Sequence, residues 1–189
     1  MGRLIYMAIA SLDGYVADRD GDFSWAMPGD EVHQFVNDLV RPVGTHLYGR
    51  RMYETMRAWE LDPSLAAHSP VTSDFAAIWQ AGDKVVYSRT LTAVETERTR
   101  IERSFDPAAV RALKASAPAD LTVSGPGLAA HALRAGLVDD LHLFLAPAIV
   151  GGGTPALPAA LRLGLELAGE RSFPGGMAYL RYAVVQPIE

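Results

Sequence analysis

Short apolar runs and helical periodicities alternate from the start of the chain. The run from Leu4 to Ala10 is apolar without interruption and ends at the turn formers Ser11 to Gly14. This pattern predicts a strand that is buried on both faces at the centre of a sheet. Residues 29–39 then place apolar side chains at i, i+3, i+4 and i+7, which predicts an amphipathic helix with Asp30 as its N-cap.

The same two patterns alternate as far as residue 136. Further strands are predicted at Thr45 to Tyr48, Lys84 to Tyr87, Thr99 to Ser104 and Leu121 to Val123. Further helices are predicted at Arg50 to Met56, at Val71 to Gln80, from Asp106 onward and at Leu128 to Ala135. The pair Asp106-Pro107 puts a capping residue before a proline, a common start for a helix. Alternation of this kind is typical of a mostly parallel sheet with helices on both faces.

The last third of the chain changes to consecutive strands. They are predicted at Asp140 to Ala146, Leu163 to Ser172 and Met177 to Val185, and Pro174-Gly175-Gly176 signals a hairpin between the last two. A hairpin makes its two strands antiparallel. We therefore expect an α/β fold with a mixed, mostly parallel central sheet and antiparallel C-terminal strands.

Length and composition narrow the class of protein. The 189 residues show no composition break or long linker, which predicts a single domain over 1–189. A net charge of -5 provides no basic field for a phosphate backbone, so we expect no nucleic-acid partner. The absence of cysteine excludes disulfide scaffolds, thiolate zinc sites and cysteine nucleophiles.

The apolar segments are too short for targeting or membrane insertion. The N-terminus reaches the charged Asp13 early and lacks a small-residue cleavage pattern, so we expect no signal peptide. No apolar run approaches the ~20 residues that a membrane span needs. We expect a cytoplasmic protein with no membrane partner.

The sequence lacks the motifs of metal and nucleophile chemistry. Its five histidines show no metal-ligand spacing, so no metal site is predicted. Neither a G-x-S-x-G elbow nor a G-x-x-x-x-G-K-[ST] loop is present. Hydride transfer needs only a cofactor, a proton source and a closed pocket, and this pattern favours it.

Three junctions that follow predicted strands share turn formers and, in two cases, arginine. They are Leu47-Tyr48-Gly49-Arg50-Arg51, Val86-Tyr87-Ser88-Arg89-Thr90 and Val123-Ser124-Gly125-Pro126-Gly127-Leu128-Ala129. In a parallel sheet such junctions lie at the carboxyl edge, where helix N-termini offer N–H donors to phosphate. Gly125, Gly127 and Ala130 have the G-x-G-x-x-A spacing, but the acidic residue expected about 20 residues later is missing. A standard dinucleotide-binding unit is therefore disfavoured, and a simple tight turn remains an alternative.

Other polar positions have both a chemical and a structural interpretation. Ser88-Arg89-Thr90 offers a guanidinium and two hydroxyls to a phosphomonoester, or forms a solvated loop. Asp30 could sit at a pocket mouth and pair with a heterocycle or relay a proton, or it could only cap its helix. Asp13-Gly14 is best interpreted as a turn. Gly151 to Gly153 forms a flexible connection or, as the second choice, a backbone wall against a ligand.

These motifs together resemble the dihydrofolate reductase-like family. Their order in the chain is Ser11 to Ala17, Tyr48 to Glu54, Lys84 to Leu91, Gly125 to Ala129, Gly136 to Leu141, and Pro147 with Gly151 to Pro155. The chain is most similar to the reductase domain of bacterial riboflavin biosynthesis, the RibD C-terminal domain, and to its single-domain relatives. The resemblance runs from about Leu4 to Val185 and implies a three-layer α/β/α fold with NADPH as hydride donor.

The resemblance also implies roles for individual residues. The pyrophosphate would be held by Gly49, Arg50 and Arg51 and by Gly125, Pro126, Gly127, Leu128 and Ala129. Ser88, Arg89 and Thr90 would take the adenosine 2′-phosphate, and Ile9 and Val16 would border the nicotinamide. Trp25 precedes Asp30 by five residues, as in the folate enzymes, and this spacing maps Asp30 to the acid that binds the pterin.

The sequence thus predicts an NADPH-dependent oxidoreductase. Its substrate would be a small nitrogen heterocycle or a ribosylamino-pyrimidine, as for a 5-amino-6-(5-phosphoribosylamino)uracil reductase, with Asp30 as the catalytic residue. The alternatives are dihydrofolate reduction and a catalytically silent NADPH-binding protein. An apolar C-terminal strand edge also predicts a homodimer.

Overall fold

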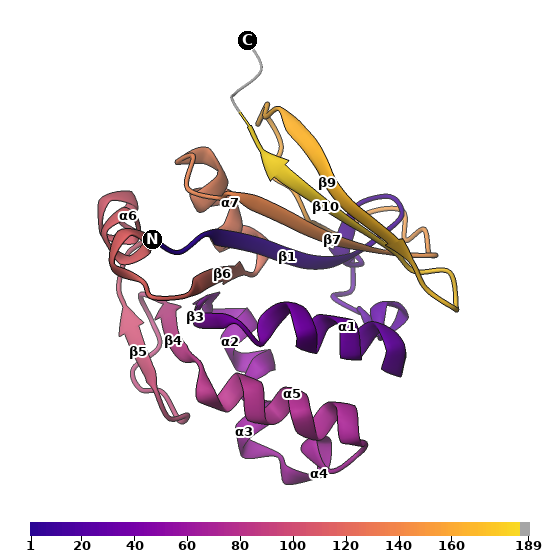
Figure 1. Cartoon of the computed structure of the whole chain (residues 1–189), viewed down its shortest axis with the longest axis horizontal. Coiled ribbons are helices and arrows are strands. Elements are labelled where there is room, and N and C mark those ends of the chain that lie inside the picture. Colours follow the sequence, from indigo (N-terminus) through magenta and orange to yellow (C-terminus); the bar gives the residue numbers. More distant parts are fainter. Residues whose placement is uncertain (186–189) are drawn as a thin grey trace.

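An eight-stranded sheet forms the centre of the molecule in the computed structural model, which describes residues 1–185 (Figure 1). Its strand order is β5-β4-β3-β6-β1-β7-β10-β9. The strands are β1 (Leu4–Ser11), β3 (Val43–Gly49), β4 (Asp83–Tyr87), β5 (Thr99–Glu102), β6 (Asp120–Ser124), β7 (Asp140–Ala146), β9 (Leu165–Ser172) and β10 (Ala178–Val184). The short strands β2 (Tyr15–Ala17) and β8 (Thr154–Pro155) pair separately.

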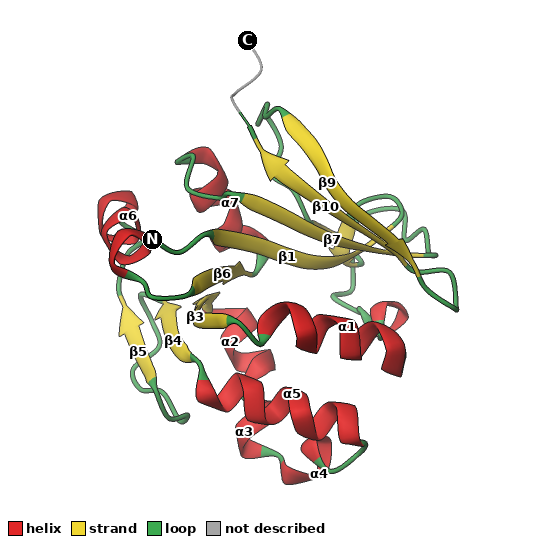
Figure 2. Cartoon of the chain, in the orientation of Figure 1, coloured by secondary structure: helices red, strands yellow, loops and turns green. Residues whose placement is uncertain are grey.

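The helices lie between these strands along the chain (Figure 2). They are α1 (Asp30–Val40), α2 (Arg50–Met56), α3 (Ala58–Leu61), α4 (Pro63–Ala66), α5 (Pro70–Ala81), α6 (Pro107–Ser116) and α7 (Pro126–Arg134), with a 3-10 turn η1 (Ser24–Ala26). The prediction of a single domain over 1–189 includes four residues, 186–189, that lie outside the described part.

The direction of the strands confirms the predicted mixed sheet. β1 pairs in parallel with β6 and β7, and β3 pairs in parallel with β4 and β6. β10 is antiparallel to both β7 and β9. β1 therefore lies in the interior of the sheet, as its unbroken apolar sequence predicted.

Apolar side chains from opposite faces of the strands build two separate layers of core. On one face, Leu4 and Tyr6 of β1 pack with Val110 of α6 and with apolar residues of α7. On the other face, Phe144 of β7 packs against Val32 of α1, while α2 and α5 cover β3 and β4. Helices thus cover both faces of the sheet and make the predicted three layers.

The structure differs from the sequence expectations in several places. The middle of β1, from Met7 to Ile9, is half-buried rather than buried on both faces. The helix predicted from Leu128 begins at Pro126, because Gly125 adopts φ +92° and turns the chain directly into the helix. α3, α4, β2 and β8 were not predicted, because each is only two to four residues long.

Candidate functional site

The three predicted junctions meet at the carboxyl edge of the sheet. Parallel register sets Tyr48 of β3 beside Ser124 of β6, and Gly49 beside Tyr87 of β4. The segments that follow these strands therefore start next to one another although they lie up to 76 residues apart in sequence, between Gly49 and Gly125. A ligand crevice forms at such an edge in open α/β sheets.

Glycines allow close backbone contact between two of the junctions. A Cβ atom added to Gly125 would lie 3.3 Å from Met52 Cβ and 4.0 Å from Gly49 N. One added to Gly49 would lie 3.7 Å from Leu128 Cβ, whereas one added to Gly127 would meet nothing within 4 Å. The backbone at Gly127 is therefore open to a ligand, and that at Gly125 needs glycine because of its positive φ.

The first turns of α2 and α7 begin at these glycines. Gly49 is the N-cap of α2 and Gly125 is the N-cap of α7, so no side chain caps either helix. The first-turn N–H groups of a helix have no partner within the helix, and they carry partial positive charge. Two first turns at one edge are suited to an anionic group such as a pyrophosphate.

Arg50 connects the first junction to the second. Its Nη1 donates to Thr90 Oγ1 at 2.8 Å, and its Nε donates to Glu54 Oε1 at 2.7 Å. Glu54 fixes the guanidinium from within α2, and Thr90 receives it from the loop after β4. The structure thus joins Arg50, which the resemblance assigned to the pyrophosphate, to Thr90, which it assigned to the 2′-phosphate.

The Ser88 hydroxyl organises its own loop. Ser88 is buried, and its Oγ accepts hydrogen bonds from the backbone N–H groups of Thr90 (3.3 Å) and Leu91 (3.0 Å). A serine hydroxyl retains one proton to donate after accepting two bonds. Arg103 pins the same loop, since its Nη1 donates to the carbonyls of Ser88 (3.2 Å) and Leu91 (2.6 Å). The sequence analysis missed Arg103, which follows a strand but belongs to no recognisable motif.

Arg51 and Arg89 are exposed at the same edge. Within residues 1–185, neither guanidinium takes part in a hydrogen bond or an ion pair. Two arginines that are not engaged with carboxylates leave positive charge available to a phosphate. This local charge contrasts with the net charge of -5 of the whole chain.

Ile9 and Val16 lie on neighbouring strands, β1 and β2, and both are half-buried. Ile9 stands beside Phe144 of β7 and packs against the apolar cluster under α1. Half-buried aliphatic side chains of this kind offer an apolar surface to a planar ring.

Asp13 holds two loops together. Its carboxylate accepts from the backbone N–H groups of Val150 (3.1 Å) and Gly151 (2.8 Å). Hydrogen bonding from the Ser11 hydroxyl, and then from these amides, lowers the pKa of Asp13 below its ordinary value. The predicted turn at Asp13-Gly14 is present, and its carboxylate also binds the start of the Gly151 to Gly153 segment, for which a flexible connection was expected.

Asp30 lies in the first turn of α1 and is exposed. The N-cap of the helix is Gly29, so the predicted capping role of Asp30 is wrong: the helix begins at Asp30 itself, one residue earlier than a cap at Asp30 requires. Asp30 borders a hollow between α1 and α5, with Gln34, Pro70 and Val71. Within residues 1–185, it forms no hydrogen bond or ion pair with the three junctions.

His33, one helical turn after Asp30, is a further polar residue that the sequence analysis did not single out. Its ring centroid lies 5.7 Å from that of Trp59 and 5.2 Å from that of Phe75. Burial among these rings lowers the pKa of His33, and the charge of Asp30 partly opposes this shift. No spacing signal marks His33, because the aromatic partners come from α3 and α5.

The arrangement defines a class of fold, a three-layer α/β chain in which two helix first turns and exposed arginines lie at the carboxyl edge of the sheet. A family model, the RibD C-terminal domain, matches residues 3–179. The chain therefore belongs to the RibD C-terminal domain family. Uncharacterized protein YyaP of Bacillus subtilis (strain 168) is 22% identical over 182 residues, which are 95% of this chain and 94% of that protein.

Solved structures confirm the dihydrofolate reductase-like fold of this family. A putative riboflavin biosynthesis protein from Shewanella sp. PV-4 is similar with a TM-score of 0.76 and 20% identity, over 97% of this chain and 99% of that chain. RibD from Acinetobacter baumannii is similar with a TM-score of 0.74 and 16% identity, over 98% of this chain but 58% of that chain.

Two features are absent from residues 1–185. No helix there has the length and apolar character needed to cross a membrane. No group of three or more His, Cys, Asp or Glu side chains there is arranged to hold a metal ion.

Proposed function

We propose that this protein is an NADPH-dependent reductase that transfers a hydride to a small nitrogen heterocycle of the ribosylamino-pyrimidine type. The observation that carries the proposal is the meeting of three strand ends at one edge. There, two helix first turns open beside Arg50, Arg51 and Arg89. Membership of the RibD C-terminal domain family supports a reductase of the riboflavin-pathway type.

The residues present fit this cofactor. The open backbone at Gly127 and the first turns after Gly49 and Gly125 suit the pyrophosphate. Ser88, Arg89 and Thr90 suit the 2′-phosphate, since Arg89 is exposed and the loop is fixed by Arg103. A bound NADPH would supply the hydride, and Ile9 and Val16 would border its nicotinamide.

Asp30 is the proposed residue for orienting the substrate or passing it a proton through water. Its exposed position beside α5 favours a second candidate, a protein that binds NADPH without turnover. The two candidates differ in one respect: the reductase oxidises its bound NADPH when substrate is added, and the silent protein does not.

The test is the loss of nicotinamide absorbance when NADPH-loaded protein meets a ribosylamino-pyrimidine or dihydrofolate. The proposal expects oxidation of NADPH with the pyrimidine. Asp30→Asn should lower kcat by about 10²-fold or more with little change in NADPH affinity. Asp38→Asn, on the exposed side of the same helix, is the matched control. Tight NADPH binding with no oxidation on either substrate would establish the silent protein instead.

A further inference from the structure

The first turns of α1, α2 and α7 differ in charge. Those of α2 and α7 contain no acidic residue, whereas that of α1 contains Asp30 and Glu31. Carboxylates in a first turn are attracted to the partial positive charge there, and they neutralise what an anionic ligand would otherwise use. The start of α1 therefore lacks the property that suits the starts of α2 and α7 to phosphate.

The acidic first turn of α1 lies on the substrate side of the proposed site. Ile9, the proposed border of the nicotinamide, packs in one apolar cluster with Val32 of α1 and Trp25 of η1. Asp30 and Glu31 come directly before Val32 in the chain. β6 separates β1 from β3 in the sheet, so this end of the site is distinct from the junction at Arg50.

The chain around this first turn is strongly acidic. Residues 12–40, from the end of β1 to the end of α1, contain seven acidic side chains, one arginine and no lysine. The arginine is Arg19, and its Nη2 donates to the Gly151 carbonyl at 3.1 Å. A Cβ added to Gly152 would lie 2.7 Å from Arg19 Nε, so the guanidinium packs against the backbone of this loop.

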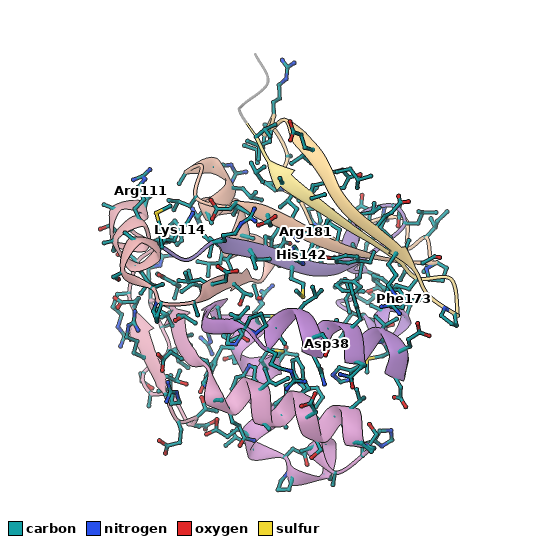
Figure 3. All side chains as sticks on the ribbon, in the orientation of Figure 1. Asp38, Arg111, Lys114, His142, Phe173 and Arg181 are labelled. Carbon is teal, nitrogen blue, oxygen red and sulfur yellow. The ribbon has the colours of Figure 1, made fainter. Side chains whose placement is uncertain are left out.

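Arg171 of β9 reaches the same first turn from another part of the chain. Its Nη2 donates to Glu31 Oε1 at 2.8 Å, and its guanidinium lies 5.0 Å from the ring centroid of Phe35 and 4.7 Å from that of Phe173. Figure 3 labels Phe173 at the end of the β9–β10 hairpin, next to α1. Within residues 1–185, no other cation pairs with Asp30 or Glu31. The charge of Arg171 is thus already matched by a carboxylate.

Exposed apolar side chains lie at the neighbouring strand ends. Leu12 follows β1 and is 63% exposed, and Ile149 follows β7 and is 75% exposed. The two strands end side by side, since Ser11 pairs with Ala146, and Leu12 N donates to the Ala148 carbonyl at 2.7 Å. An apolar surface beside carboxylates suits an uncharged ring that carries hydrogen-bond donors.

We propose that the substrate of this site carries no phosphate and no other anionic group, so a ribosylamino-pyrimidine is accepted in its unphosphorylated form rather than as its 5′-phosphate. This inference rests on the proposed function and narrows its substrate class. A phosphate beside Asp30 and Glu31 is repelled by like charge, and the nearby Arg171 is engaged with Glu31. The N–H and O–H groups of an uncharged substrate can instead donate to these carboxylates.

Calorimetric titration of NADP⁺-saturated protein tests this selectivity without turnover. The probes are a ribosylamino-pyrimidine and its 5′-phosphate, and saturating NADP⁺ keeps the phosphate probe from the cofactor end of the site. At low salt the unphosphorylated probe should bind at least about tenfold more tightly, and about 0.5 M salt should narrow the difference. Tighter or equal binding of the 5′-phosphate, or no binding of either probe, overturns the inference. Failure of NADP⁺ to bind overturns the proposed function itself.

A charge reversal in the first turn of α1 tests the cause of the selectivity. Glu31→Lys adds a cation there and leaves Arg171 without its carboxylate partner, so affinity for the 5′-phosphate should rise by about tenfold or more. Asp38→Lys makes the same charge change about two turns later on α1, where the side chain is 62% exposed, and should leave the preference intact. Unchanged NADP⁺ affinity in both variants verifies folding. An unaltered preference in Glu31→Lys would contradict the assignment.

Discussion

Individual arginines at the carboxyl edge differ in how firmly the chain holds them. Arg50 is fixed by Glu54 and Thr90, and Arg103 by two carbonyls, whereas Arg51 and Arg89 are exposed. Sequence reasoning found Arg50, Arg51 and Arg89 because they follow strand and turn signals. It could not find Arg103, because the role of Arg103 depends on its contact with the carbonyl of Ser88, fifteen residues earlier in the chain.

His46 is a buried titratable residue that we expect to make stability depend on pH. It is 4% exposed, and its Nδ1 lies 2.8 Å from Thr122 Oγ1. Burial, and then the charge of Lys84, lowers the pKa of His46 from 6.5 to about 4. The folded state therefore binds fewer protons than the unfolded state between these pH values, and stability falls as the pH falls through that window.

The expected loss from His46 is roughly 2 to 3 kcal/mol between pH 6.5 and pH 4. Chemical denaturation at a series of pH values measures it. In His46→Gln the loss of unfolding free energy between pH 6.5 and pH 4 should be smaller than in wild type by that amount. An unchanged loss would mean that His46 does not titrate differently in the folded and unfolded states.

The observed helices and strands agree with the sequence predictions where the periodicity extends over several residues. The boundaries of α5 agree closely, because Ser69 and Thr72 form a capping box and Gly82 ends the helix. β9 begins two residues later than predicted and contains an irregularity opposite Arg181 and Tyr182. Such an irregularity depends on the partner strand, so local sequence does not reveal it.

The glycines that precede β8, the partner strand of β2, give a prediction at the scale of elements. Gly153 has φ +137°, and a Cβ there would lie 2.1 Å from the carbonyl oxygen of Ala17. Gly153→Ala should destabilise the fold by about 2 kcal/mol or more, because the strain of a positive φ is added to the clash of the new Cβ with the backbone of Ala17. Gly151→Ala, at φ +71° with open space around its Cβ, should cost only the strain, about 1 kcal/mol. Thermal unfolding compares the two, and equal losses would contradict the packing of Gly153 against β2.

Two regions of the sheet differ in character at the scale of the whole molecule. The carboxyl edge has exposed arginines within a chain of net charge -5, and the far strand β9 is exposed at seven of its eight residues. Figure 3 shows His142 and Arg181 on β7 and β10, between these regions. The class of fold was predictable from the sequence, and so were the residues at the three strand ends. The placement of Asp30 beside α5 was not, because it depends on how two helices pack.

Paired titrations of NADPH and NADH test the central claim, that the carboxyl edge holds a phosphorylated dinucleotide. Wild type should bind NADPH at least tenfold more tightly than NADH, since a guanidinium on the 2′-phosphate contributes about 1.5 to 3 kcal/mol. Arg89→Ala should remove most of this preference, while Arg111→Ala, on the exposed side of α6, should leave it intact. Equal affinity for the two nucleotides in wild type, or an unchanged preference in Arg89→Ala, would contradict the account.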